Sequence, residues 1–204
     1  MGEPDAMPTK RSPELQHFID CVQNAILTSE GLPDEARTVA GNIYGALASE
    51  EGKFDANPAQ RLPVCEHLPA AFENAQQGPA AAAQLGEALA AIEPLLAWNK
   101  KPTDDSYFDE RHANAVVVGL GGIEQRYDAR IGVSLVAPDT LYPDHNHPPQ
   151  EIYAVLSEST WRQNEGPWRK PGLGGWVYNP ANISHAMRSY DTPLLAVWSL
   201  WLNG

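Results

Sequence analysis

Four residues in the second half of the chain have the types and the spacing of metal ligands. His145 and His147 are two of only six histidines in 204 residues, Glu151 follows four positions after His147, and His185 lies farther along. In an extended segment residues i and i+2 share a face, so the first two imidazoles can point the same way, and the proline pair that follows can turn the glutamate back toward them. Three imidazoles and one carboxylate suit one divalent transition ion, such as zinc, iron, manganese, cobalt or nickel, better than calcium or magnesium.

An alternative interpretation of these residues needs no metal. His145 and His147 are then solvated residues beside a proline turn, and His185 ends a strand. We favour the metal interpretation because His185 follows a turn of its own, residues 179–182, in the same strand-rich half of the chain.

The ligand pattern resembles the two metal-binding motifs of the cupin superfamily, a double-stranded β-helix or jelly-roll barrel. The matching positions are His145, His147 and Glu151 in the first motif and Gly174, Pro180, Asn182 and His185 in the second. Cupin motifs generally have glycine where this chain has Asp139, Glu158 and Asn182. The resemblance implies a metal-binding barrel that includes the last third of the chain.

A longer stretch resembles the bacterial cupin-type dimethylsulfoniopropionate (DMSP) lyases. The likeness covers residues 142–153, the helical extension before a single C-terminal barrel, and the tryptophan-rich end. That family cleaves its zwitterionic substrate to dimethyl sulfide and acrylate, so the resemblance implies a carbon–sulfur lyase whose small-molecule partner is DMSP. The family pattern places one tyrosine two residues after the metal-binding glutamate and another three residues before the first histidine; these are Tyr153 and Tyr142.

β-Elimination from a sulfonium requires a base for the proton next to the carboxylate. We expect Tyr153 to be that base because a strand directs residue i+2 to the same face as Glu151. A free phenol has a pKa of about 10, so the cation must lower it. A metal-bound substrate carboxylate would stabilise the charge that develops. Tyr142 is expected to position the carboxylate or to act as a second base; without the resemblance, Tyr153 is a core phenol and Tyr142 a turn residue.

Aromatic faces are natural receptors for a sulfonium, a soft cation without hydrogen-bond donors. Trp198 can face the barrel interior, which places Trp201 on the opposite face by parity. We therefore expect Trp198 and Tyr178 to line the substrate pocket. Residues 164–175 are rich in glycine and proline and are expected either to cover the site as a mobile lid or to form a plain surface loop.

The elements that must position these residues fall into two unlike halves. Ser12 is a predicted N-cap and Pro13 the first residue of a helix that ends near Gly31. A second helix is predicted from Pro33 to the break at residues 50–52, a third over 58–77 with interruptions at its prolines, and a fourth over 79–98. Short strands rich in valine, isoleucine, tyrosine and tryptophan follow at 115–120, 131–137, 151–157, 175–178 and 194–202.

The predicted fold class is mainly β with an α extension. We expect N-terminal helices, residues 1–104, to pack on a C-terminal cupin barrel, residues 105–204, in one compact unit. The helices are expected to cover one sheet edge or the barrel mouth, or to form a dimer interface, so a monomer and a homodimer both stay open.

Composition limits the classes of partner. A formal net charge of −12 argues against nucleic acid and against an anionic membrane surface as partners. Residues 1–11 have no apolar signal-peptide core, and no apolar stretch approaches the roughly 18 residues of a membrane span. Cys21 and Cys65 have neither disulfide-framework nor zinc-ribbon spacing, so we expect a cytoplasmic location.

Two other functions fit a cupin metal site. One is a metal-dependent dioxygenase that acts on a small organic acid, and the other is a non-catalytic cupin that binds a small molecule. An assay without oxygen separates the lyase from the dioxygenase, because the elimination proceeds without oxygen whereas turnover by an oxygenase stops. A Tyr153→Phe variant separates a lyase from a binding protein, because only the lyase needs the hydroxyl for turnover.

Overall fold

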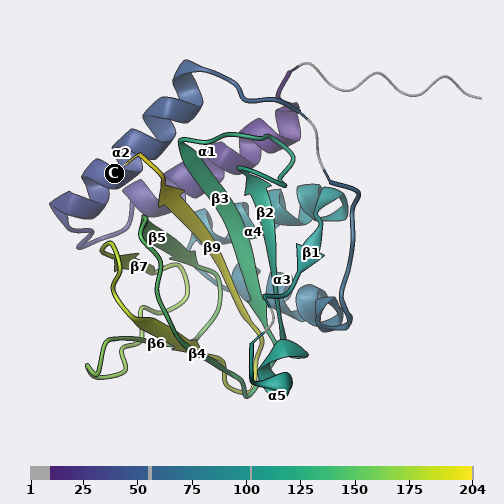
Figure 1. Cartoon of the computed structure of the whole chain (residues 1–204), viewed down its shortest axis with the longest axis vertical. Helices are drawn as coiled ribbons and strands as arrows, with labels where there is room; N and C mark the ends of the chain where they lie inside the picture. Colours follow the sequence, from purple (N-terminus) through teal and green to yellow (C-terminus); the bar gives the residue numbers. More distant parts are fainter. Residues whose placement is uncertain (1–9, 55–56, 102, 204) are drawn as a thin grey trace, which may run out of the picture.

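A computed structural model describes residues 10–54, 57–101 and 103–203 and places a layer of helices against a β-barrel (Figure 1). The helices are α1 (Pro13–Leu27), α2 (Asp34–Ser49), η1 (Pro63–His67), α3 (Leu68–Gln76), α4 (Ala80–Ile92), η2 (Glu93–Leu95) and α5 (Ser106–Asp109). The strands are β1 (Trp98–Asn99), β2 (His112–Val118), β3 (Ala129–Val136), β4 (Leu141–His145), β5 (Gln150–Val155), β6 (Thr160–Gln163), β7 (Trp176–Asn179), β8 (His185–Arg188) and β9 (Leu194–Trp201). Residues 1–9, part of the segment in which the sequence predicts no signal peptide, lie outside the described residues.

Local signals explain where the helices begin. The Ser12 hydroxyl accepts a hydrogen bond from the Leu15 amide at 3.2 Å, and Pro13 opens α1, which confirms the predicted cap. The helical segment predicted over 58–77 is divided near its prolines, as expected, but it begins only at Pro63. Pro63 and Pro69 stand in the first turns of η1 and α3, where the missing amide hydrogen costs nothing.

The strands of the described chain form two antiparallel sheets. One sheet has six strands in the order β1-β2-β3-β9-β5-β7, and the other has three in the order β4-β8-β6. The five predicted strands all overlap strands of the larger sheet. The smaller sheet was not predicted, because its strands have only four or five residues and β4 contains Pro143 and Asp144, which disfavour strands.

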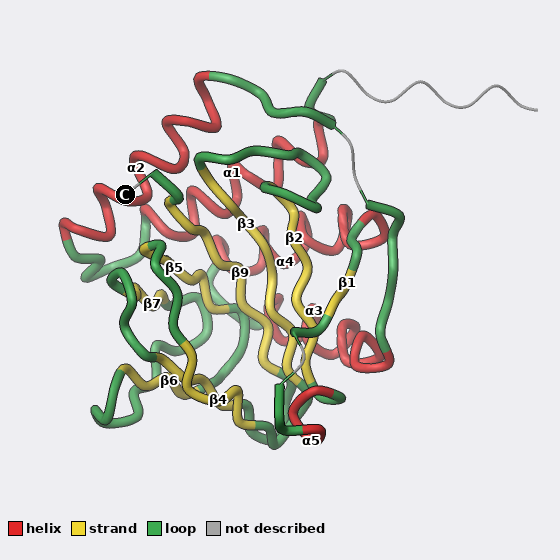
Figure 2. The backbone as a smooth tube through the Cα atoms, viewed as in Figure 1, coloured by secondary structure: helices red, strands yellow, loops and turns green. Residues whose placement is uncertain are grey.

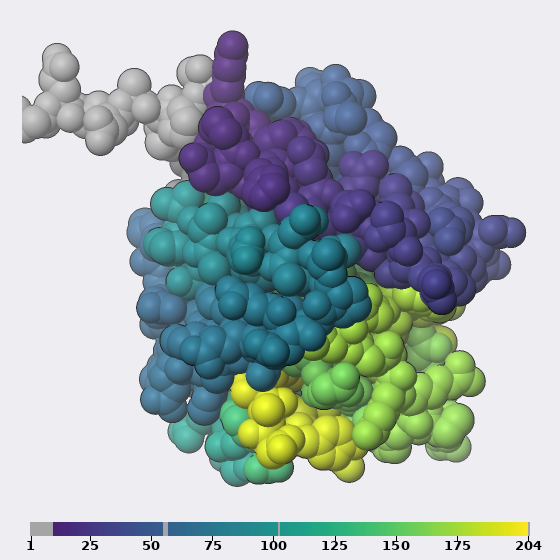
Figure 3. All heavy atoms as spheres, turned by 180° about the vertical axis from the view of Figure 1, so that it is seen from behind, coloured from purple at the N-terminus to yellow at the C-terminus, as the bar shows by residue number. Residues whose placement is uncertain are grey.

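Alternation along the larger sheet separates two cores. Its outer face, with Ile152, Tyr178 and Val197, packs against the helices (Figure 2). Seen from behind, the helical N-terminal half of the chain covers much of the molecule (Figure 3). The inner face of the larger sheet, with Tyr153 and Trp198, packs against the smaller sheet. Two antiparallel sheets that enclose their own core form the predicted cupin barrel, and the helices cover a sheet face rather than an edge or mouth.

Three details of the strands and turns around the site affect its geometry: the faces of two tryptophans, the backbone conformation of two turn residues, and one backbone hydrogen bond. Trp198 lies in the inner core and Trp201 packs against the outer one, as parity predicted. Asp139 and Asn182 adopt left-handed backbone with φ of 52° and 61°, which explains why related motifs have glycine there and why aspartate and asparagine are tolerated. The backbone amide of Asn182 also donates to the His147 carbonyl at 2.9 Å, so the turn before His185 is bonded directly to the segment that contains His147.

A buried carboxylate connects the helical layer to the barrel. Glu124 is fully buried and accepts bonds from Arg11 Nε at 2.7 Å, Arg11 Nη2 at 2.9 Å and the Gly52 amide at 2.8 Å. Arg126 lies 3.6 Å from the same carboxylate. These bonds fix the chain before α1 and after α2 to the barrel.

Cys21 and Cys65 are buried free thiols. In the part of the chain that the structure describes, no helix combines the length and the apolar character needed to cross a bilayer.

Candidate metal centre

Three side chains from different segments converge inside the barrel. Glu151 lies on β5, His185 begins β8, and His147 lies between β4 and β5; their ligand atoms are all within 4.8 Å of one another. Oε2 of Glu151 is 3.2 Å from His147 Nε2 and 3.4 Å from His185 Nε2. Ligand atoms about 2.05 Å from one tetrahedral ion are about 3.3 Å apart, so these two spacings match a shared ion.

Backbone carbonyls orient all the candidate histidines. Nδ1 lies 2.9 Å from the Pro143 carbonyl in His145, 2.9 Å from the Pro149 carbonyl in His147, and 3.0 Å from the Ile183 carbonyl in His185. A carbonyl only accepts, so the proton sits on Nδ1 and Nε2 is left as the ligand atom.

His185 Nε2 is the strongest sign that something is bound. It is buried and has no hydrogen-bond partner among the described residues. Buried polar atoms are normally satisfied. A metal ion would satisfy this one, so the residues present fit such an ion.

His145 lies at the edge of this group, outside the three residues whose ligand atoms are all within 4.8 Å of one another. Its ring centroid is 4.1 Å from that of His185, its register partner across β4 and β8, but 6.5 Å from that of His147. The strand ends at His145, so the i, i+2 geometry expected for the two histidines is lost. Burial, together with the charge of His185, lowers the pKa of His145 to about 4.

The pKa shifts favour an ionised Glu151 and a neutral His185, with His147 hydrogen-bonded to the carboxylate. Burial lowers the pKa of His185. Burial opposes charge on His147, but the hydrogen bond to Glu151 and its charge together raise the pKa of His147. Burial alone would raise the pKa of Glu151, and the bonds and charges of its neighbours outweigh this and lower it.

Two amide side chains support the carboxylate from behind. Asn179 on β7, which is fully buried, donates Nδ2 to Glu151 Oε2 at 3.0 Å. Gln163 on β6 donates Nε2 to Asn179 Oδ1 at 2.8 Å. Neither residue was predicted from the sequence. The available signal was that Asn179 directly follows the strand predicted at 175–178 and points to the same face as Val177.

A cavity of about 470 Å³ opens beside the ligands. Tyr142, Tyr153 and Trp198 line it together with His145, His147 and Glu151. Tyr153 and Trp198 are register partners on β5 and β9. Burial and the charge of Glu151 raise the pKa of Tyr153 well above its ordinary value. The Tyr142 ring centroid lies 4.6 Å from that of His145, and burial also raises the pKa of Tyr142.

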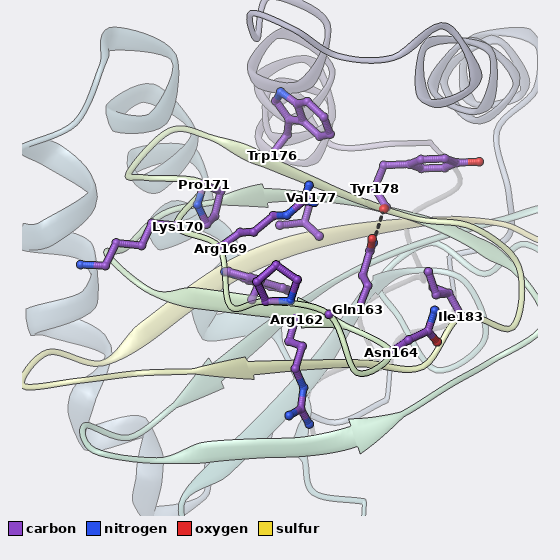
Figure 4. A pocket seen from close by; sticks show the side chains of 13 residues that line it. Arg162, Gln163, Asn164, Arg169, Lys170, Pro171, Trp176, Val177, Tyr178 and Ile183 are labelled. Atoms are coloured by element: carbon purple, nitrogen blue, oxygen red, sulfur yellow. Dashed lines mark hydrogen bonds between the residues drawn. The ribbon is translucent and has the colours of Figure 1, made fainter.

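The structure does not bring Tyr178 to this cavity. Tyr178 pairs with Ile152, so it shares the outer face of the sheet, where its hydroxyl accepts a bond from Gln150 at 2.7 Å. Figure 4 shows Tyr178 directed away from the barrel interior, while Gln163 bonds to its backbone carbonyl. The expectation that Tyr178 lines the substrate pocket therefore had the wrong strand parity.

The expected lid also lies elsewhere. Residues 164–175 border a separate pocket with Trp176 and Tyr178 (Figure 4). The rim of the ligand cavity includes residues of the segment 97–101 and the turn at 120–121. The glycine and proline content predicted a loop, but not the face it covers.

Arg130 is a further cavity residue that the sequence analysis missed. It lies on β3 at the same parity as Gly132 and Ser134. The available signal was that Arg130 is the one charged residue of β3, a mostly apolar strand, and has the parity of the inner face.

Comparison with known proteins gives consistent matches. The family model described as dimethylsulfoniopropionate lyase matches residues 35–196. The curated dimethylsulfoniopropionate lyase DddQ of Ruegeria pomeroyi is 34% identical over 95 residues, which cover 46% of this chain and 47% of that protein. The putative dimethylsulfoniopropionate lyase DddL of Cereibacter sphaeroides is 26% identical over 147 residues, 70% of this chain and 60% of that protein. The chain thus matches less than two thirds of the length of either curated relative.

Two solved structures share the fold over nearly the whole chain. A structure described as that of the DMSP lyases RdDddP and RnDddQII has a TM-score of 0.71 and 24% identity, and covers 92% of each chain. The DddQ structure from Ruegeria pomeroyi has a TM-score of 0.64 and 22% identity, and covers 94% of this chain and 92% of that one. At these identities the likeness concerns the fold.

Proposed function

Because the chain belongs to the dimethylsulfoniopropionate lyase family, we propose that it is a metal-dependent carbon–sulfur lyase that cleaves DMSP to dimethyl sulfide and acrylate. The observation that supports this most is the convergence of His147, Glu151 and His185 beside a cavity that also contains Tyr153. The curated relatives have the same activity in their names.

The proposed ligands of one divalent ion are His147, Glu151 and His185, with His145 as the fourth. The orphaned Nε2 of His185 and the carbonyl-bound Nδ1 atoms support this assignment. A bound zinc, iron, manganese, cobalt or nickel ion would supply positive charge that stabilises the substrate carboxylate as it gains charge and that lowers the pKa of the nearby phenol.

Tyr153 is the proposed base. Its phenolate oxygen would take the proton from the carbon next to the carboxylate, the C–H electrons would form the carbon–carbon double bond, and the carbon–sulfur bond would break with its electrons leaving on sulfur. The products are acrylate and neutral dimethyl sulfide, so the leaving group needs no acid. Burial holds the phenol in place, since Tyr153 is 3% exposed.

Tyr142 and Trp198 are proposed to complete the substrate site. Tyr142 has its ring beside His145 and lines the same cavity, which suits a role in positioning the carboxylate. Trp198 lies opposite Tyr153 in the strand register and lines the same cavity, which suits a role in enclosing the substrate.

The test is release of dimethyl sulfide. Purified, metal-loaded protein is incubated with DMSP under nitrogen, and the headspace is analysed before and after chelation. We expect dimethyl sulfide from the loaded protein only. No release from loaded protein refutes the proposal; a requirement for oxygen indicates the dioxygenase, and binding of DMSP without turnover indicates the binding protein.

A further inference from the structure

Arg130 stands in the wall of the ligand cavity without an anionic partner. Its Nε is buried and lacks a hydrogen-bond partner among the described residues. Burial lowers the pKa of Arg130, but a guanidinium stays charged in proteins. Arg130 as a whole is only half-buried, but its Nε is a buried polar atom without a partner, which is costly, and an anion bound beside it would supply the missing acceptor.

Two glycines make room for this arginine and for the ring next to it. A Cβ on Gly119, which has a φ of +117°, would lie 2.6 Å from Arg130 Cγ. A Cβ on Gly132 would lie 2.2 Å from Trp198 Cζ2. The guanidinium carbon lies 5.8 Å from the centroid of the Trp198 ring, within cation–π range. Arg130 and Trp198 therefore form an ordered pair.

Strand register places this pair next to the metal ligands. Arg130 pairs with Leu200, and Leu200 pairs with Glu151, so the arginine and the metal-ligand candidate lie in one row, two strand spacings or about 10 Å apart. The adjacent row contains Gly132, Trp198 and Tyr153. An acid whose reacting carbon faces Tyr153 is thus within reach of a long arginine side chain.

The charge of the cavity favours an anion. Lys100 and Lys101 line the same cavity as Arg130, and Glu151 is the one carboxylate among its described lining residues. Glu151 is already engaged by His147 and Asn179. In a chain with a net charge of −12, this is a local excess of positive charge at the entrance to the site.

We propose that Arg130, oriented by Trp198, binds one oxygen of the carboxylate of a small organic acid in this cavity, while the other oxygen faces the proposed metal site. The Trp198 ring then holds the guanidinium, and the sulfonium of a substrate lies elsewhere. The identity of the acid as DMSP or acrylate rests on the proposed function, whereas the anion site follows from the geometry of Arg130.

The experiment compares an acid with its neutral amide. Binding of propionate and of propionamide to zinc-loaded protein is measured by calorimetry for the parent, R130Q, R130K and R169Q. Arg169 is the control because it lines the separate pocket under residues 164–175. We expect R130Q to weaken propionate binding about 10- to 100-fold, the value of a hydrogen bond to a charged group. R130K should lose less, R169Q should match the parent, and propionamide binding should stay unchanged.

Propionate affinity unaltered in R130Q overturns the proposal, and so does an equal loss of propionamide binding. If circular dichroism shows R130Q to be unfolded, R130K and W198F decide: weaker propionate binding in both supports the site, and parental binding in both rejects it. Dimethyl sulfide release separates the two proposals. A parent that binds propionate through Arg130 but releases no dimethyl sulfide refutes only the function, whereas release with an unchanged KM in R130Q refutes only the anion site.

Discussion

Replacing Asn179 by alanine tests the metal centre through a residue that does not itself bind the ion. The asparagine is fully buried and donates to Glu151 Oε2 at 3.0 Å. A hydrogen bond to a charged group contributes about 1.5–3 kcal/mol, which corresponds to about 10- to 150-fold in a binding constant. Loss of outer-shell partners of metal ligands typically costs about 10- to 100-fold in affinity. We therefore expect the Kd for Zn²⁺ to rise about 10- to 100-fold in N179A.

The assay is competition for Zn²⁺ with a chromophoric chelator at fixed pH, on variants shown to be folded by circular dichroism. Gln163→Ala is the matched control, because Gln163 bonds to Asn179 at 2.8 Å and is one bond farther from the carboxylate. Its effect should be smaller than that of N179A. A folded N179A protein with the Zn²⁺ affinity of the parent would refute the assignment of Glu151 as a metal ligand that Asn179 holds in place.

Three other perturbations give expected outcomes. Tyr153→Phe should lower dimethyl sulfide release about 10²- to 10⁴-fold while Zn²⁺ affinity is kept; loss of Zn²⁺ binding would instead show a structural role. Because the pKa of His145 is lowered from 6.5 to about 4, the unfolded chain binds more protons between these values, so metal-free protein should lose stability as pH falls through this window. Urea denaturation of H145Q should show a shallower loss, and an equal slope contradicts the reasoning. Glu124→Gln leaves the buried Arg11 side chain without a carboxylate, although Arg126 keeps Asp128, and should cost about 3–5 kcal/mol of unfolding free energy. Arg61→Gln breaks a pair whose arginine side chain is 59% exposed and whose buried partner, Glu93, keeps the bond from Trp98 Nε1, so it should cost only about 1 kcal/mol; equal costs would refute the distinction.

Long elements with strong local signals were predictable from the sequence. The Ser12 cap, the apolar spacing of α1 and α2, and the apolar runs of β3, β5 and β9 are all local properties. The smaller sheet was not predictable in this way. Its short strands are stabilised by pairing with one another, as between His145 of β4 and His185 of β8, and not by their own propensity.

The site was predictable to the extent that residue types reveal chemistry. Histidines and a glutamate at metal-ligand spacing identified the segment, and parity placed Trp198 inside. Tyr178 was misplaced because the sequence does not show which residues of β7 face the barrel interior, and the pairing with Ile152 that places it on the outer face is not a local property. Arg130 and Asn179 could not be assigned roles, since their partners, Trp198 and Glu151, are distant in sequence and adjacent only through strand register.

The distribution of the candidate ligands over both sheets has a consequence for the lifetime of the protein. Glu151 belongs to the larger sheet and His185 to the smaller one, so an ion held by both acts as a cross-link through the barrel. Binding energy of this kind adds to the stability of the native state. Protein synthesised when the ion is scarce would open its smaller sheet more often and be cleaved there by proteases. The amount of intact protein would then follow the supply of the ion, independently of how fast the gene is expressed.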